Sequence, residues 1–484
     1  MANDNRSNDA ISGKSGNISG KAGEVVGNLE WDGLHRPRIF YAVATTFCGL
    51  FLSVLDGTIC NVALPTMALE LGVSPSDSIW IINAFQLVIM MLLLPFSSLG
   101  ELIGYKKVYL TGVVVFTLGS TMCSLSGGFH MLVASRVLQG IGAAMIMSVN
   151  TSLIKIIYPK RHLGKGVGLN ATVVAIASVT GPSLAALILS VATWEWIFAI
   201  NIPVGIATFI LARKYLPDNP TRVLGRKFNW HDAILNAATF GLMIGCIEAY
   251  SHGTDIHRVA IVVVIFFIVA AIYVRTQLHR DFPMLPFDLL RIPIFSMSVG
   301  TSIISFTTQQ LLMVSLPFML MHTYGYDAVG TGLLMTASPI VIAFAAPLAG
   351  WLIGKVHPGI LGCVGISLIS VSCFSFSFAP ADISHFGIVW RLMCFGAGFG
   401  LFQSPNNHIL LSSAPAYRTG SASGMLASAR LIGQTTGAAL VALMFNIFGP
   451  RAPHNALLLG GILAIIGASL SIMRLNAHPA SYRR

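Results

Sequence analysis

The stretch LDGTICNVALP, residues 55–65, places one carboxylate, Asp56, inside a long apolar segment. The segment begins near Ile39, so at a rise of about 1.5 Å per residue Asp56 lies about 25 Å along a helix, in the outer part of a bilayer core about 30 Å thick. A charge at that depth costs several kcal/mol unless it is hydrated, paired or protonated, which makes Asp56 a candidate functional residue. The alternative is a helix-end carboxylate that reaches the water of the headgroup layer.

Composition extends this picture to the whole chain. Of its 484 residues, 55% are hydrophobic and 10% are charged, whereas a soluble globular protein carries about 25% charged residues. The sequence therefore predicts an all-α polytopic membrane protein. We expect fourteen spans, near residues 39–62, 78–99, 108–126, 130–154, 166–190, 196–215, 232–250, 259–276, 295–320, 329–353, 359–379, 386–411, 420–447 and 455–473.

The net charge of +11 is a signal of topology rather than of nucleic-acid binding. If the N-terminus is inside, 24 of the 29 Lys and Arg residues lie on cytoplasmic segments, and only Arg258 and Arg451 lie on the other side. This bias predicts that both termini are cytoplasmic, in a multi-pass protein of the plasma (inner) membrane.

The second candidate residue lies in the fourth predicted span, SRVLQGIGAAMIMSVNTSL, which contains Arg136. Arg136 is about six residues from the outer end, roughly 9 Å deep, so it lies on the same side of the bilayer as Asp56. A buried guanidinium needs an acceptor, and Asp56 is the acid at matching depth. The alternative is that Arg136 extends to the outer headgroups.

An internal repeat divides the chain. Seven residues recur 256 positions later: Gly140, Gly142, Ser148, Asn150, Gly168, Gly181 and Leu184 return as Gly396, Gly398, Ser404, Asn406, Gly424, Gly437 and Leu440. A parallel repeat predicts two six-helix bundles with the substrate path between them, and the two extra helices fall at the joint.

The repeat also gives the predicted division of the chain into domains. A disordered cytoplasmic tail (1–38) precedes the N-terminal bundle (39–215). A linker with two additional helices (216–294), the C-terminal bundle (295–473) and a cytoplasmic C-terminus (474–484) follow. The seven cysteines are scattered singly through the apolar spans, with no CxxC pair and no His/Cys cluster, so we expect small buried apolar residues and no metal site.

Charged groups are concentrated in the first predicted bundle. The position equivalent to Asp56 is near Thr308, where neutral amides replace the acid. Candidate substrate-binding residues are therefore Glu248, Gln309, Gln310, Gln403 and Asn406. For the amides, hydrogen bonds between helices are an equal alternative, and Glu248 has the alternative of an interfacial carboxylate.

Four motifs in this order resemble the major facilitator superfamily, specifically its fourteen-helix drug:proton antiporter branch (EmrB/QacA type). They are LDGTICNVALP (residues 55–65), RVLQGIGAA (136–144), Gly181-Pro182 and WEWIFAINIPVG (194–205). The resemblance implies a role in proton coupling for Asp56, with Arg136 as its arginine.

The resemblance also implies a gating role for two further segments. One is Gly181-Pro182. The other is the predicted loop from Ser97 to Gly112, which keeps Gly104, Lys106 and Lys107. It departs from the family pattern, with Glu101-Leu102 in place of an Asp-Arg pair and Tyr105 in place of an arginine.

These observations predict a proton-coupled secondary transporter that exports small amphipathic compounds, as in drug efflux, by alternating access. A lipophilic cation is one candidate substrate, the lipid bilayer is the other partner, and the proton is the only coupling ion, with no other cofactor. A proton-coupled importer or facilitator of a nutrient is the alternative. An enzyme or sensor would need a nucleophile–base pair, a metal cluster or a phosphate loop, and the sequence shows none.

Overall fold

The computed structural model describes residues 25–27, 32–159, 162–219, 221–223, 228–251, 256–280, 283–353, 355–380, 382–414 and 419–475. The first half contains the helices α1 (Arg38–Glu70), α2 (Pro75–Ser78), α3 (Trp80–Ile103), α4 (Tyr105–Ser124), α5 (Phe129–Ile157), α6 (Leu163–Val191), α7 (Trp196–Ala199) and α8 (Asn201–Tyr215). Two further helices follow, α9 (Trp230–Ser251) and α10 (Ile256–Leu278).

The second half has the same character. Its elements are η2 (Phe287–Arg291), α11 (Pro293–Phe318), the π-helix η3 (Met319–Thr323), α12 (Ala328–Met335), α13 (Ala337–Leu352), α14 (Pro358–Ser377), α15 (His385–Ser412), α16 (Thr419–Phe448), η5 (Gly449–Arg451) and α17 (Ala452–Met473).

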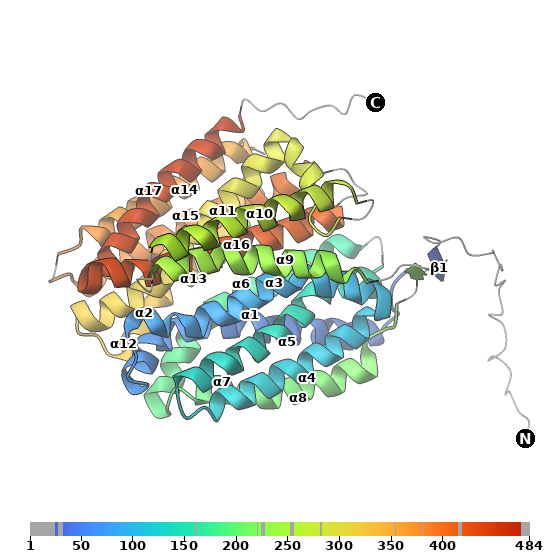
Figure 1. Ribbon diagram of the computed structural model, residues 1–484, viewed down its shortest axis with the longest axis horizontal. Helices are drawn as coiled ribbons and strands as arrows, with labels where there is room; N and C mark the ends of the chain where they lie inside the picture. The colour runs from blue at the N-terminus through green and yellow to red at the C-terminus, as the bar shows by residue number, and fades with distance from the viewer. Residues whose placement is uncertain are drawn as a thin grey trace, which may run out of the picture.

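The helices of each half pack mainly on one another. α1 packs against α5, α6 and α8, and α11 packs against α15, α16 and α17. In Figure 1 the first half, blue to green, fills the lower part of the molecule, and the second half, yellow to red, fills the upper part. α9 and α10 lie across the front between them, and α9 contacts α3 of the first half and α16 of the second.

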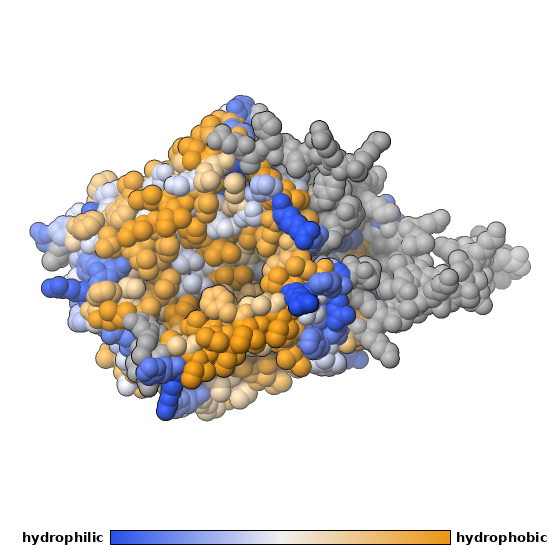
Figure 2. Space-filling view, turned by 45° about the horizontal axis from the view of Figure 1, so that its top comes forward, coloured by the Kyte–Doolittle hydropathy of each residue, from blue (hydrophilic) through white to orange (hydrophobic). Residues whose placement is uncertain are grey.

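Twelve stretches of the described chain are long and apolar enough to cross a membrane. The face shown in Figure 2 agrees, because apolar side chains cover its middle and hydrophilic ones gather toward its ends. The chain is thus an all-helical multi-pass membrane protein, apart from two short strands.

The two strands lie outside the helical part. β1 (Val25–Gly27) pairs antiparallel with β2 (Thr221–Val223). Most of the tail predicted to be disordered, and most of the predicted cytoplasmic C-terminus, lie outside the described residues. The strand at Val25–Gly27 departs from the expectation of an unstructured tail.

The predicted loop from Ser97 to Gly112 is wrong. α3 continues to Ile103 and α4 begins at Tyr105, so Gly104 alone separates the two helices. Gly104 has a φ of 108°, a conformation that is open to glycine and strained for other residues. Hydropathy ended the predicted span where the residues become polar, but the helix extends beyond that point.

Glycines related by the repeat make equivalent close contacts. A Cβ atom on Gly140 would lie 2.9 Å from a backbone oxygen of α3, and one on Gly396 would lie 2.3 Å from a backbone oxygen of α13. Similarly, Gly142 packs against the backbone of α4, and Gly398 packs against that of α14. Only glycine allows these backbones to approach so closely.

A proline in α3 fixes the position of the inserted helix pair. Pro95 has no N–H, so the carbonyl of Met91, four residues earlier, lacks its helical donor. Asn236 of α9 donates to that carbonyl at 2.7 Å and accepts from the hydroxyl of Tyr273 of α10 at 2.8 Å. The pair α9–α10 is therefore attached to α3 at the point where the proline interrupts its hydrogen bonds.

Candidate functional site

Asp56 and Arg136 form an ion pair inside the first half. α1 carries Asp56 and α5 carries Arg136, and both side chains are 0% exposed. One guanidinium nitrogen, Nη1, donates to Oδ2 of Asp56. The structure thus brings together the two residues that depth alone had matched.

Three further groups hold the guanidinium of Arg136. Its Nε donates to the carbonyl oxygen of Ile81 at 2.8 Å, and Nη1 also donates to Oε1 of Gln139 at 2.6 Å. The ring of Phe85 lies under it, with its centroid 4.1 Å from Cζ, in the geometry of a cation–π contact.

Neutral amides complete the environment of the carboxylate. Oδ1 of Asp56 accepts from Nε2 of Gln139 at 2.8 Å and from Nδ2 of Asn201 at 2.9 Å. Nε2 of Gln139 also donates to Oγ of Ser120 at 2.8 Å. Four helices, α1, α4, α5 and α8, therefore contribute polar side chains to one buried network, and α3 contributes the carbonyl of Ile81.

Sequence reasoning found the ion pair and missed the amides. Gln139 is three residues after Arg136, a spacing that places both on one helix face, and this is the signal that could have identified it. Gly119 explains why Ser120 reaches the network, since a Cβ atom on Gly119 would lie 2.6 Å from the backbone of Gln139.

This network can respond to a single proton. Three atoms donate hydrogen bonds to the carboxylate while it is charged, namely Nη1 of Arg136, Nε2 of Gln139 and Nδ2 of Asn201. Removal of its charge would leave the guanidinium of Arg136 buried without a counter-charge. Nη2 of Arg136 already lacks a partner among the residues that the structure describes. Because a buried charge without its partner costs several kcal/mol, protonation of Asp56 would favour a different arrangement of these helices.

Gly181 and Pro182 lie between α1 and the second half. A Cβ atom on Gly181 would lie 2.3 Å from Oγ1 of Thr58, two residues from Asp56 on α1. The carbonyl oxygen of Pro182 lies 2.8 Å from the Cβ position of Gly332 on α12, and Ser183 hydrogen-bonds to Thr336 at 2.9 Å. α6 therefore contacts both the helix of the ion pair and the opposite half.

The predicted gating residues after α3 lie beside the end of α8. Asn219 accepts from the N–H of Tyr105 at 2.9 Å and donates to the carbonyl of Gly100 at 3.3 Å, so it bridges the break at Gly104. Glu101 is half-buried and lies within electrostatic range of Lys155 on α5. Lys106 is half-buried and Lys107 is exposed.

The predicted substrate-binding residues come from three helices, α9, α11 and α15. Gln309 and Gln403 are half-buried, on α11 and α15. Gln310 is buried against α16, and its Nε2 has no hydrogen-bond partner. Asn406 is bonded within the second half, where it donates to Oγ of Ser302 at 2.7 Å. Glu248 belongs to α9, but its side chain is outside the described part of the chain.

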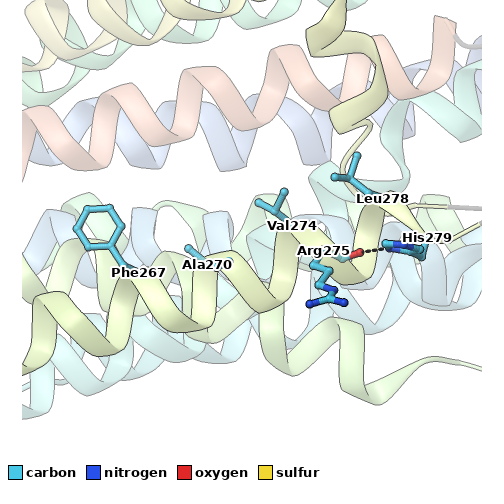
Figure 3. A pocket seen from close by; sticks show the side chains of 7 residues that line it. Phe267, Ala270, Val274, Arg275, Leu278 and His279 are labelled. Carbon is cyan, nitrogen blue, oxygen red and sulfur yellow. Dashed lines mark hydrogen bonds between the residues drawn. The ribbon is translucent and has the colours of Figure 1, made fainter.

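A groove of about 480 Å³ lies along α10, and Figure 3 shows its lining residues. Its walls are almost entirely apolar, with Arg275 and His279 at one end, where Nδ1 of His279 lies 2.7 Å from the carbonyl oxygen of Arg275. All seven lining residues come from the end of α10 and the residue after it, and most of that helix faces outward, as expected of a lipid-facing surface. The groove is separate from the network around Asp56.

Among the residues that the structure describes, no group of three or more His, Cys, Asp or Glu side chains could hold a metal ion.

Comparison with known families and proteins identifies the type of protein to which this site belongs. Residues 46–438 and 299–483 match the family model described as Major Facilitator Superfamily. The chain is 48% identical to the protein of Escherichia coli described as "Uncharacterized transporter YebQ", over 93% of this chain and 98% of that protein.

More distant relatives have names that mention different substrates. The riboflavin transporter RibZ of Clostridioides difficile is 29% identical over 82% of this chain and 86% of its own length. The multidrug export protein EmrB of Escherichia coli is 27% identical over 82% of this chain and 78% of its own length.

Solved structures show the same fold. A POT family transporter in complex with a thioalcohol-conjugated peptide matches with a TM-score of 0.69 at 15% identity, over 90% of this chain and 95% of that one. A bacterial homologue of the lysosomal transporter Spinster, in an inward-facing and unoccupied conformation, matches with a TM-score of 0.65 at 15% identity, over 92% of this chain and 98% of that one.

Proposed function

Because the chain belongs to the major facilitator superfamily, and is therefore a membrane transporter, we propose that it is a proton-coupled exporter of small amphipathic compounds. The observation that carries the proposal is the buried network in which Asp56 contacts Arg136, Gln139 and Asn201. An ionisable group buried inside a membrane bundle is characteristic of proton relays in transporters.

In the proposed cycle, charged Asp56 pairs with Arg136, and protonation from outside breaks the pair. The two halves then rock about the seam between them, and substrate binding in the inward state favours loss of the proton to the cytoplasm. Each charge moved through 100 mV supplies about 2.3 kcal/mol and each pH unit supplies about 1.4 kcal/mol. Alternating access requires a ligand that prefers one state, and the proton supplies that preference.

Contacts between the halves support a closed state at one end of the molecule. Oγ of Ser76 on α2 donates to the carbonyl of Ala442 at 3.1 Å and accepts from Nδ2 of Asn446 at 2.7 Å. With cytoplasmic termini this end is the outer one, so these bonds would have to break before protons enter from outside. Gly181 and Pro182 would transmit the change from α1 to α12.

The same proposal includes the fourteen-span topology of the drug:proton antiporter branch. The last of the twelve candidate spans covers both α16 and α17, and α9 is not among the twelve. Treating α16 and α17 separately and adding α9 gives the fourteen spans that the sequence predicts. Two six-helix bundles (39–215 and 295–473), joined by 216–294 and with both termini in the cytoplasm, would then cross the plasma membrane.

Relatives named as multidrug or export proteins favour export, whereas the relative named as a riboflavin transporter keeps an importer as the second candidate. Proteoliposomes with an imposed pH gradient test the proposal, using ethidium and riboflavin as fluorescent probes. We expect the native protein to move one of these probes against the proton flow. We expect Asp56→Asn to abolish that accumulation and to keep part of the probe exchange. Unimpaired pumping by Asp56→Asn would refute the proton-coupling scheme, and movement with the proton flow would favour import.

A further inference from the structure

A second buried arginine lies far from the ion pair, at the end of the last helix. Arg474 is the C-cap residue of α17 and is only 1% exposed. An arginine that merely anchors a helix end extends to the headgroups and stays accessible. Arg474 is instead enclosed between the ends of α11, α15 and α17.

Among the residues that the structure describes, only one of its guanidinium nitrogens has protein partners. Nη1 donates to Oδ1 of Asn406 at 2.7 Å and to Oγ of Ser298 at 3.4 Å. Nε and Nη2 have no partner in this part of the chain. These two atoms form the edge of a guanidinium that binds a carboxylate or phosphate with two parallel hydrogen bonds.

Within the described residues, the charge of Arg474 also has no carboxylate as a counter-charge. Burial lowers the pKa of its guanidinium to about 10, so it remains protonated at neutral pH. No described carboxylate lies within salt-bridge distance of it. Asn406, its closest partner, is neutral. Nδ2 of Asn406 donates to Oγ of Ser302 and to the carbonyl oxygen of Ser298.

The neighbouring helix adds to the positive field. Ser298 lies in the second turn of α11, whose N-cap, Ile292, makes no side-chain capping bond. The N-terminus of a helix carries a partial positive charge and unsatisfied N–H groups. An anion beside Arg474 would therefore be stabilised by a full charge and by the end of α11.

We propose that the Nε–Nη2 edge of Arg474 is a phosphate-binding site at the membrane boundary of the second half. Arg474 directly follows the last candidate membrane span, which ends at Met473, so phosphate would be supplied either by a phospholipid headgroup or by free inorganic phosphate. Because Arg474 is only 1% exposed, the last turn of α17 would have to move to open the edge to its ligand. Binding would fasten the ends of α11, α15 and α17 together.

The test uses the purified full chain and thermal unfolding, so it does not depend on transport. One arm adds inorganic phosphate in detergent against sodium chloride of equal ionic strength. The other compares nanodiscs of phosphatidylcholine with nanodiscs that also contain phosphatidylglycerol. We expect Tm to rise by about 1–2 °C when phosphate exceeds its Kd tenfold. A response in only one arm identifies the source of the phosphate.

Variants link the response to the guanidinium edge. Arg474→Gln should lose the rise in Tm. Arg474→Lys keeps the charge but not the two parallel N–H donors, so it should lose more than half of that rise. Arg451→Gln is the matched control, because Arg451 is the exposed arginine at the other end of α17, and it should respond like the native protein. The proposal is wrong if neither arm stabilises the native protein, or if Arg474→Lys responds as the native protein does.

Discussion

In the first half, α1 and α5 meet at a buried carboxylate and guanidinium, Asp56 and Arg136. At the equivalent place in the second half, α11 carries Thr308 and α15 carries Arg391. Thr308 donates to carbonyl oxygens of α11 and α17, at 3.0 and 3.4 Å. Arg391 is half-buried and donates to the carbonyls of Ser375 and Gly387, at 3.1 and 2.7 Å.

The two halves share their helix packing and differ in the charges that the packing encloses. Equivalent glycines bring the helices of both halves together in the same way, but only the first half holds an acid there. A hydroxyl bonded to a carbonyl cannot change its charge near neutral pH, whereas a carboxylate can. The proposed response to protons therefore belongs to the first half, because the second half has no carboxylate at the equivalent place, where Arg391 is bonded to carbonyls instead.

Replacement of Arg136 should have the largest effect, and replacement of Arg391 a much smaller one. Arg136→Gln leaves a buried carboxylate without its counter-charge and should lower the free energy of unfolding by about 3–5 kcal/mol. Arg391→Gln removes only bonds to carbonyls and should cost about 1 kcal/mol. Thermal or denaturant unfolding in detergent measures both. Adding Asp56→Asn to Arg136→Gln should recover part of the loss, and equal costs for the two arginines would contradict the comparison.

Replacement of a buried amide should also cost more stability in the first half than in the second. Gln139→Leu removes bonds to both members of the ion pair and should cost about 1.5–3 kcal/mol. Gln310→Leu, in the second half, removes an amide nitrogen that has no partner and should leave stability unchanged or raised. The same unfolding assay decides between these outcomes, and a large loss for Gln310→Leu would show that its amide has a structural role.

Two equivalent glycines test how each half tolerates added volume. Gly181→Ala should cost about 2 kcal/mol, because its Cβ would meet Oγ1 and Cβ of Thr58. Thr58→Ala should rescue it in part, since it removes the clashing oxygen. In Gly437→Ala, the added Cβ would lie 2.6 Å from the backbone oxygen of Thr307. Because that oxygen belongs to the main chain, no side-chain substitution at Thr307 should rescue the variant. Unfolding of the single and double variants provides the measurement.

A loss of only about 1 kcal/mol is expected where the inserted helix pair meets α3. Asn236→Ala leaves the carbonyl of Met91 and the hydroxyl of Tyr273 without their partners and should cost about 1 kcal/mol. Pro95→Ala in the same background restores an N–H donor to that carbonyl, so it should reduce the loss. Unchanged stability of the double variant relative to Asn236→Ala would contradict this explanation.

The sequence predicted the helical membrane fold and the two residues that the structure brings into contact, because a charge inside an apolar span is conspicuous. Neutral amides such as Gln139 and Asn201 carry no charge that would distinguish them in an apolar span. Their contacts depend on how each helix is rotated about its axis. The end of α3 was missed for a related reason, since hydropathy follows the membrane core whereas the helix ends only at Gly104. The Nε–Nη2 edge of Arg474 could not be predicted, because in sequence Arg474 resembles any basic residue at a helix end, and its burial depends on how α11, α15 and α17 pack.

The central claim is that Asp56 links substrate movement to proton movement. Proteoliposomes that enclose a pH-sensitive dye test it directly, with a gradient of whichever probe, ethidium or riboflavin, the native protein transports. We expect that gradient to drive protons across the membrane with the native protein, and to drive none with Asp56→Asn although the probe still exchanges. Proton movement of equal size in Asp56→Asn would contradict the account.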